Sequence, residues 1–233
     1  MESLRFGSRT FGTHQPDEVI RPTLAVERSL LAAGARYVGG IDEVGRGALA
    51  GPVSVGVCVV DASADEVPEG LADSKLLTAH AREALMPVVS TWGVARAVGH
   101  ASAEEIDAVG IIAALRRAAV RALESLAVVP DVVILDGSHD WLTRPDDIFA
   151  DQSAFATPPV HMMVKADQQC ASVAAASVLA KVTRDAIMQD LETTHPGYGL
   201  ASHKGYASEA HRDAIRSLGA STIHRRSWNL LGD

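Results

Sequence analysis

Two adjacent carboxylates, Asp42 and Glu43, directly precede a Gly45-Arg46-Gly47 loop near the start of the chain. Carboxylate oxygens are the ligands that hard divalent cations prefer, and a glycine loop lets backbone N–H groups come close to an anion. A site that holds a metal ion beside a phosphate provides what hydrolysis of a phosphodiester needs. The stretch therefore predicts metal-assisted chemistry on a phosphate ester.

The spacing of these two acids raises a geometric question. Successive residues of a strand point to opposite faces, so Asp42 and Glu43 can serve one site only if the strand ends there or if two metals lie off its tip. Gly45 and Gly47 permit a sharp exit from the strand. For Glu43 the alternative is a solvent-facing residue at the strand end. Asp42 follows Ile41 and two glycines, which favours a buried carboxylate with a partner or a metal.

Two isolated acids could complete such a site. Asp136 ends the apolar run 132–135 and precedes Gly137, where a sheet edge can present chemistry, although an Asp-Gly turn explains the pattern equally well. Asp167 opens a long Ala-rich segment. Helix capping is the commoner role of an Asp so placed, and the positive end of the helix would also favour nearby anions.

Length and composition predict one domain over 22–233, preceded by a mobile N-terminal extension over 1–21. The chain has 233 residues, 47% hydrophobic and only 4% aromatic, so Ala, Val and Leu must fill the core. Cys58 and Cys170 are expected to be small buried apolar residues, because two cysteines make neither a disulfide framework nor a cysteine-rich zinc site. No signal peptide or membrane span is recognisable, so we expect a cytoplasmic protein.

The formal net charge of -8 argues against a simple nucleic-acid binder. Metal loading would offset part of this charge, and the C-terminal segment is locally basic. Its cations are Lys204, Arg212, Arg216, Arg225 and Arg226. Charge alone favours the interpretation that they are solvated. His203 and His211 resemble a metal pair, but the abundance of carboxylates favours surface or phosphate-contacting roles for them.

Hydrophobic periodicity predicts strands that come early and then alternate with helices, which indicates an α/β fold with a mixed sheet flanked by helices. The predicted helices are 23–33, 79–89, 103–109, 111–127, 168–191 and 208–218. The predicted strands are 37–42, 52–60, 93–99, 132–135 and 160–164. The loop 137–159 is long for a compact domain, which favours a functional or mobile segment.

Five stretches, in order along the chain, resemble ribonuclease HII, the bacterial type 2 ribonuclease H. They are 40–53, Asp73-Ser74-Lys75, Leu135-Asp136-Gly137, the Ala-Ala-Ala-Ser run 174–185 and Ser202-His203-Lys204-Gly205-Tyr206. The first stretch and the Ala-rich run are the most specific. The resemblance covers roughly 23–218 and departs from the family pattern at Leu76, Ala166 and Gln168.

The resemblance implies a ribonuclease H-like mixed sheet with a C-terminal helical segment. It implies a monomeric endonuclease that cuts the RNA strand of RNA–DNA hybrids and incises duplex DNA 5′ to an embedded ribonucleotide, using two Mg²⁺ or Mn²⁺ ions. The carboxylates that match the family's metal ligands are Asp42, Glu43, Asp136 and Asp167. The residues that match substrate-contacting positions are Gly45, Arg46, Gly47 and Tyr206, with Lys75 and Lys181 as further phosphate contacts.

Alternatives remain for the residues and for the activity. Arg46 could form a structural salt bridge to one of the acids, and Tyr206 could be a partly buried aromatic at a helix entrance. A related metal-dependent DNA nuclease or integrase-like enzyme is the second candidate activity, and a non-catalytic nucleic-acid binder is the third. Four crowded carboxylates argue against the binder and predict at least one raised pKa or avid cation binding. In-line attack of water would leave a 3′-hydroxyl and a 5′-phosphate.

Overall fold

The computed structural model describes residues 21–64, 66–143 and 155–232. The expected mobile extension over 1–21 and the middle of the 137–159 loop fall almost entirely on residues outside these ranges. No helix in the described ranges is both long and apolar enough to cross a membrane.

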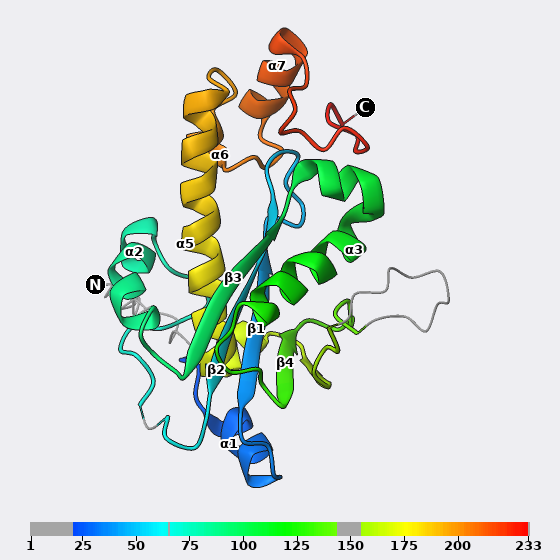
Figure 1. The fold of residues 1–233 in the computed structure, drawn as a ribbon. Helices are drawn as coiled ribbons and strands as arrows, with labels where there is room; N and C mark the ends of the chain where they lie inside the picture. The colour runs from blue at the N-terminus through cyan, green and yellow to red at the C-terminus, as the bar shows by residue number, and fades with distance from the viewer. Residues whose placement is uncertain (1–20, 65, 144–154, 233) are drawn as a thin grey trace, which may run out of the picture.

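The described chain forms a five-stranded sheet with helices on both faces (Figure 1). The strands are β1 (Val38–Val44), β2 (Val53–Val60), β3 (Ala95–Ala101), β4 (Val132–Asp136) and β5 (Val160–Met163). The helices are α1 (Ala25–Ala32), α2 (Ala79–Val89), α3 (Ala103–Glu124), α4 (Ala166–Gln169), α5 (Ala171–Thr194), α6 (Leu200–His203) and α7 (Glu209–Leu218). The predicted mixed sheet flanked by helices is confirmed.

The sheet order is β3-β2-β1-β4-β5. Strand β2 is antiparallel to both of its neighbours, β1 and β3, whereas β4 is parallel to its neighbours, β1 and β5. Between β1 and β4 the register pairs Val38 with Val132 and stops at Ile41 opposite Leu135. The two parallel strands therefore end their pairing just before Asp42 and Asp136.

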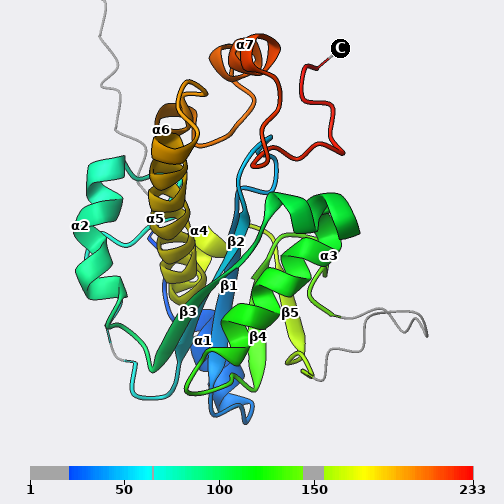
Figure 2. The same ribbon diagram turned by 45° about the horizontal axis from the view of Figure 1, so that its top comes forward.

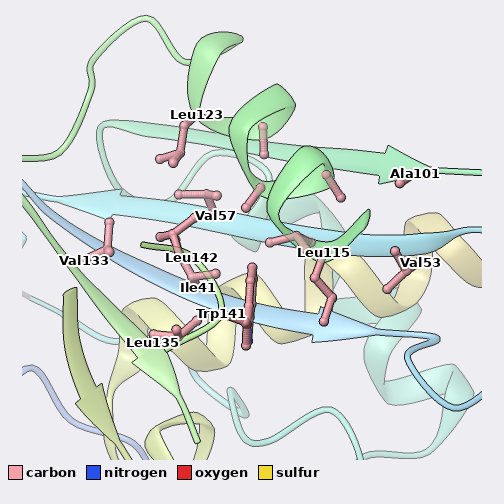
Figure 3. Packing of buried hydrophobic residues seen from close by; sticks show 14 of the residues in the cluster. Ile41, Val53, Val57, Ala101, Leu115, Leu123, Val133, Leu135, Trp141 and Leu142 are labelled. Atoms are coloured by element: carbon pink, nitrogen blue, oxygen red, sulfur yellow. The ribbon is translucent and has the colours of Figure 1, made fainter. Parts of the chain in front are cut away.

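Each face of the sheet has its own hydrophobic cluster. On one face α3 covers β1, β2 and β3, where Leu115, Leu123 and Trp141 are buried (Figure 3). On the other face lies α5, with α2 beside it (Figures 1 and 2). A third, smaller cluster joins the end of α5 to α6, α7 and the start of the 48–52 segment.

Helix α5 lies unusually close to the sheet because the strands present glycine beneath it. A Cβ at Gly40 would lie 2.2 Å from the backbone of Ser172, and one at Gly56 would lie 2.2 Å from the carbonyl oxygen of Ala176. The Ala-rich face of α5 adds little bulk of its own. This close packing fixes α5, and hence the polar residues along it, against β1.

Most predicted boundaries differ from the observed ones by a few residues, and β1 continues to Val44 instead of ending at residue 42. Two differences are larger. The predicted 168–191 helix is interrupted at Cys170, whose φ of -107° and ψ of 122° are extended. The reason is tertiary pairing: the N–H of Ala171 donates to Thr23 and the N–H of Thr23 donates to Gln169, which replaces helical bonds at this point. The short helix α6 was not predicted. The break expected at Gly110 is confirmed by its φ of 79° inside α3.

Candidate active site

The site begins where the pairing of β1 with β4 ends. The last pair is Ile41 with Leu135, and Asp42 and Asp136 are the next residues of these neighbouring parallel strands. The Oδ1 atom of Asp136 accepts a hydrogen bond of 2.7 Å from the N–H of Ala166 at the start of α4. That bond holds the first turn of α4 at the end of β4 and brings in Asp167. Asp136 interacts electrostatically with Asp42, Glu43 and Asp167, so the structure brings the four predicted carboxylates into one neighbourhood.

The side-chain contacts test the structural alternatives for these acids, namely a helix cap, an Asp-Gly turn and a solvent-facing residue. Asp167 does not cap a helix, because its Oδ2 atom lies 3.0 Å from Nζ of Lys75 and the residue before α4 is Lys165, which provides no side-chain cap. Asp136 does precede a turn glycine, since Gly137 takes a φ of +109°, while its carboxylate still belongs to the acid group. The side chain of Glu43 is only 15% exposed and lies 3.3 Å from Arg46, so it is not a free solvent-facing acid.

Burial shifts the ionisation of this group. Removal from water raises the pKa of Asp42 to about 7, and the negative charges of Glu43 and Asp136 add to the effect. Burial also raises the pKa of Glu43 and of Asp167. The expected raised pKa among crowded carboxylates is confirmed, which means that a cation is needed to hold them ionised.

Lys75 provides one such cation within the chain. Partial burial alone would lower the pKa of its ammonium group, but the charges of Asp42 and Asp167 raise it. Asp73, which the sequence analysis assigned no role, is buried and lies 3.9 Å from Nζ of Lys75, and its Oδ1 atom accepts the N–H of Lys75. The sequence signal for this fifth acid is its position in the Asp73-Ser74-Lys75 stretch, two residues before the lysine.

The donor chemistry of this group fits a hard divalent cation, because every candidate ligand is a carboxylate oxygen. Within the described ranges, no three His, Cys, Asp or Glu side chains are grouped closely enough to hold an ion as they stand. A metal ion held by these carboxylates would compete with Lys75 for Asp167. The chain's own ammonium thus neutralises part of the site.

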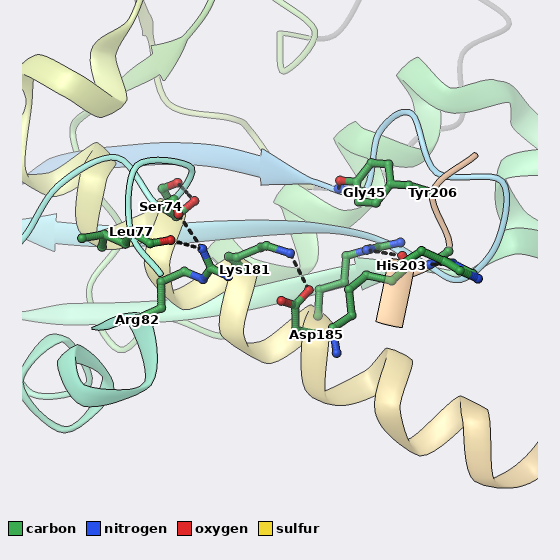
Figure 4. Close-up of polar contacts among 12 residues, drawn as sticks. Gly45, Ser74, Leu77, Arg82, Lys181, Asp185, His203 and Tyr206 are labelled. Carbon is green, nitrogen blue, oxygen red and sulfur yellow. Dashed lines mark hydrogen bonds and ion pairs between the residues drawn. The ribbon is translucent and has the colours of Figure 1, made fainter. Parts of the chain in front are cut away.

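Beside the carboxylates, the loop after β1 is held from both sides. The backbone at Gly45 is left-handed, with a φ of +82°, and its N–H donates to the hydroxyl of Tyr206 at 3.1 Å (Figure 4). A Cβ at Gly45 would lie 2.1 Å from Nε of Arg184. By contrast, Gly47 has no left-handed φ, and a Cβ there would meet no atom within 4 Å. Of these two glycines, the fold requires only Gly45.

Arg46 and Tyr206 flank this loop with exposed groups. Arg46 makes the predicted alternative salt bridge, at 3.3 Å to Glu43, with its side chain 46% exposed. Tyr206 is 38% exposed, and the guanidinium carbon of Arg184 lies 5.4 Å from its ring centroid. One side of the tyrosine ring thus contacts Arg184. The residue lies just before α7, in agreement with the alternative of an aromatic at a helix entrance, but its ring is still accessible to a ligand.

The surface or phosphate-contacting role expected for His203 and His211 is wrong for His211, whereas His203 is half-buried. His211 is fully buried and stacks on His203 with ring centroids 4.3 Å apart. The N–H of Ser221 donates to Nδ1 of His224, so neutral His224 carries its proton on Nε2, which lies 3.2 Å from Nε2 of His211. His211 then carries its proton on Nδ1 and donates to the carbonyl of Tyr206 at 2.9 Å. These rings support the tyrosine rather than a metal.

One predicted lysine is paired within the chain, and two lysines that were not predicted as site residues have unusual backbone conformations. Lys181 pairs with Asp185 at 2.7 Å on α5, so its ammonium is already engaged (Figure 4). Lys165 and Lys204 were not predicted as site residues, yet each lies two residues before Asp167 or Tyr206 and has a left-handed φ, of 58° and 52°. In the part of the chain that the structure describes, neither ammonium group forms an ion pair. Left-handed lysine is rare and strained, which marks both positions.

A comparison with known families agrees with this geometry. The family model for ribonuclease HII matches residues 39–231, which include all four carboxylates, the glycine loop and Tyr206. The chain belongs to the ribonuclease HII family. Curated relatives named ribonuclease HII include one from Streptomyces avermitilis, 49% identical over 90% of this chain and 84% of its own, and one from Paracoccus denitrificans, 45% identical over 89% and 91%.

Solved structures agree with the family and the fold. A ribonuclease H2 from Pyrococcus horikoshii has a TM-score of 0.65 and 27% identity over 84% of this chain and 95% of its own. The crystal structure of Bst-RNase HIII in complex with Mn²⁺ has a TM-score of 0.66 at 22% identity, over 97% of this chain and 74% of its own, which shows the shared fold. This ribonuclease HII-family chain is therefore a ribonuclease H, an endonuclease for the RNA strand of RNA–DNA hybrids, and the family depends on divalent metals.

Proposed function

We propose that this ribonuclease also incises duplex DNA on the 5′ side of a single embedded ribonucleotide. The observation that carries the proposal is the hydrogen bond between the N–H of Gly45 and the hydroxyl of Tyr206, 3.1 Å long. It ties an exposed aromatic ring to a loop that starts two residues after the acids of β1. The aromatic ring and loop that would recognise one sugar thus lie beside the carboxylates that would bind a metal ion.

We propose Asp42, Glu43, Asp136 and Asp167 as the ligands of two Mg²⁺ or Mn²⁺ ions. The raised pKa values of Asp42, Glu43 and Asp167, together with the negative charge of all four groups, support this assignment, since a buried carboxylate is held ionised by a cation. When bound, such ions lower the pKa of water and neutralise charge on the leaving oxygen. The chain itself would position the phosphate for attack and, through Lys75, place a positive charge next to Asp167.

Discrimination between RNA and DNA requires a contact to the 2′-hydroxyl, the one group that differs between the two sugars. We assign this contact to the backbone of Gly45, Arg46 and Gly47, because the open space at Gly47 admits a sugar edge. The exposed ring of Tyr206 would pack on the sugar at the junction with DNA, and Arg46 would exchange Glu43 for a phosphate. Lys75 and Lys181 remain proposed phosphate contacts that must first leave Asp167 and Asp185.

All proposed groups lie on one chain, which supports a monomeric enzyme. Residues 22–233 would act as one domain, because Arg225 near the C-terminus bonds to the carbonyl of Gly45 near the start. The proposed reaction leaves a 3′-hydroxyl and a 5′-phosphate, since water attacks from the side opposite the 3′-oxygen.

Three 5′-labelled substrates test the proposal: a continuous RNA–DNA hybrid, a DNA duplex with one ribonucleotide, and the same duplex without it. With Mg²⁺ or Mn²⁺ we expect cleavage of the first two only, with one cut 5′ to the ribonucleotide. The nick should be sealed by a DNA ligase, which requires a 3′-hydroxyl and a 5′-phosphate. Equal cleavage of the all-DNA duplex would favour the alternative of a DNA nuclease or integrase-like enzyme, and cleavage of the continuous hybrid alone would reject the single-ribonucleotide activity.

A further inference from the structure

Two arginines lie entirely inside the protein beneath the glycine loop. Arg184 comes from α5 and Arg225 from the segment after α7, and both are 0% exposed. Among the described residues, neither guanidinium lies within ion-pairing distance of a carboxylate. Burying a cation without an acid partner is costly, and burial indeed lowers the pKa of both, that of Arg225 to about 9. Such residues need a reason beyond packing.

Their hydrogen bonds all go to backbone carbonyl groups around one loop. Arg225 donates to the carbonyls of Gly45 at 2.6 Å, Arg46 at 2.8 Å and Gly51 at 3.2 Å. Arg184 donates to the carbonyls of Pro52 at 2.8 Å, Ala50 at 3.2 Å and Lys204 at 3.0 Å. Only a guanidinium, with five donors in a fixed plane, can hold so many carbonyls at once.

The grip of Arg225 determines where two N–H groups point. In a planar trans peptide the carbonyl of one residue and the N–H of the next point in opposite directions. Because the carbonyls of Gly45 and Arg46 are drawn inward, the N–H groups of Arg46 and Gly47 are turned outward. Both residues are exposed, and in the described structure neither N–H donates a hydrogen bond. Adjacent outward N–H groups are suited to an anion or a sugar hydroxyl.

We infer that Arg225, with Arg184, is a positioning residue of the nuclease: it holds the inner side of the 45–52 loop so that the N–H groups of Arg46 and Gly47 face the ribose and its phosphate. This inference rests on the proposed function, because it assigns the source of sugar discrimination at that site. Arg184 extends the grip to the carbonyl of Lys204 and to the ring of Tyr206. The two sides of the sensor are thus fixed by a common support.

Arg225→Lys tests the inference, because lysine keeps the charge but lacks the fan of donors. In EDTA, fluorescence anisotropy gives the affinity for a duplex with one ribonucleotide relative to the identical all-DNA duplex. We expect this ratio to fall by about tenfold or more towards unity, as expected when hydrogen bonds to a charged or polar ligand are lost. Arg96→Lys is the control, since Arg96 also donates to carbonyls, of Trp92 and Gly93, at the far end of β3.

A structural role alone would lower the affinity for both duplexes equally and leave the ratio unchanged, which would overturn the inference. The Mn²⁺-induced rise in melting temperature, which reports on the carboxylates, should persist in Arg225→Lys. If the wild-type protein itself shows a ratio of one, the proposed sugar discrimination fails, and this outcome is distinct from failure of the positioning role.

Amide hydrogen exchange in the wild-type protein provides a test that needs no variant to fold. The N–H groups of Arg46 and Gly47 should exchange at unprotected rates, whereas that of Gly45 should exchange more slowly. The ribonucleotide duplex in EDTA should then protect Arg46 and Gly47. Slow exchange of these two amides in the free protein, or no protection on binding, would overturn the inference.

Discussion

At the scale of single residues, the site combines groups that oppose one another. Asp42 is 4% exposed among other acids, with a pKa of about 7, so its charge is unfavourable in the folded protein unless a cation is present. A buried carboxylate with a strongly raised pKa is typical of a functional site. Removing the charge should therefore have opposite effects on activity and on stability.

Asp42→Asn should abolish cleavage of the single-ribonucleotide duplex while binding stays measurable. In metal-free protein it should also stabilise the fold. Between pH 3.8 and 7 the unfolded chain releases the Asp42 proton while the folded protein keeps it, so the free energy of unfolding of the wild type falls as pH rises. The advantage of Asn should grow over this window, reach the order of a few kcal/mol and stay constant above it. Urea denaturation in EDTA at pH 4.5 and 8 measures this; full activity of the variant would reject the metal assignment.

Gly47→Ala and Gly45→Ala form a matched pair. At Gly47 alanine meets no atom and needs no left-handed backbone, so the free energy of unfolding should stay the same or rise by about 0.5 kcal/mol. Cleavage of the single-ribonucleotide duplex should still fall, by roughly tenfold or more, because a methyl group would fill the space proposed for the sugar. Gly45→Ala should lose stability, by about 2 kcal/mol, through strain and collision with Arg184. Equal activity of Gly47→Ala and the wild type would show that no ligand approaches there.

Most residues of the site could be predicted from type and spacing, but their partners could not. Asp42, Glu43 and Asp136 lie beside glycines and apolar strands, which gives each a distinctive context. Arg225 has no such context, and its interpretation as a solvated cation of the basic C-terminal segment is wrong. A buried arginine that bonds to carbonyls carries no sequence pattern, because every residue in the chain has a carbonyl to offer.

At the scale of elements, the position of α5 against the sheet determines where the polar residues along it lie relative to the site. Its N-terminus has no local cap, since the side chain of Cys170 makes no capping bond. Instead Glu27 from α1 accepts hydrogen bonds from the N–H of Ser172 at 2.9 Å and from its hydroxyl at 2.7 Å. Periodicity predicted both helices but could not predict this contact, because it joins residues 145 positions apart.

Glu27→Ala should lower the free energy of unfolding by about 2–3 kcal/mol, because two donors of Ser172 lose their acceptor in a buried place. Glu27→Gln should cost clearly less, since its side-chain oxygen can still accept and burial already raises the pKa of Glu27, which disfavours the charge. Urea denaturation of the two variants provides the comparison. If alanine and glutamine cost the same, the capping contact does not stabilise α5.

At the scale of the whole molecule, a net charge of -8 must coexist with a polyanionic substrate. The cations near the site are mostly occupied: Lys75 by Asp167, Lys181 by Asp185 and Arg46 by Glu43. Lys165 and Lys204 have no such partner in the described structure, and both keep a backbone conformation that glycine would adopt without strain. At both positions a positively charged side chain is therefore present although the backbone conformation favours glycine.

Lys204→Gly should raise the free energy of unfolding by about 1 kcal/mol, because it relieves the left-handed strain and keeps the carbonyl that Arg184 binds. Duplex affinity should fall, and the slope of log affinity against log salt should become shallower by roughly one. Lys181→Gln is the comparison: its ammonium must first leave Asp185 to reach a phosphate, so its slope should change less than that of Lys204→Gly. Anisotropy titrations between low and moderate salt distinguish the two, and a steeper loss in Lys181→Gln would reassign the phosphate contact.

The grip of residue 225 on residue 45 has a consequence for biosynthesis. A chain still on the ribosome, complete to residue 200, already carries every acid of the candidate centre, yet it lacks the arginine that orients the loop. Orientation of the loop therefore depends on a residue that is translated well after the acids. On this proposal, a nascent nuclease would carry its candidate metal ligands before it could select a sugar.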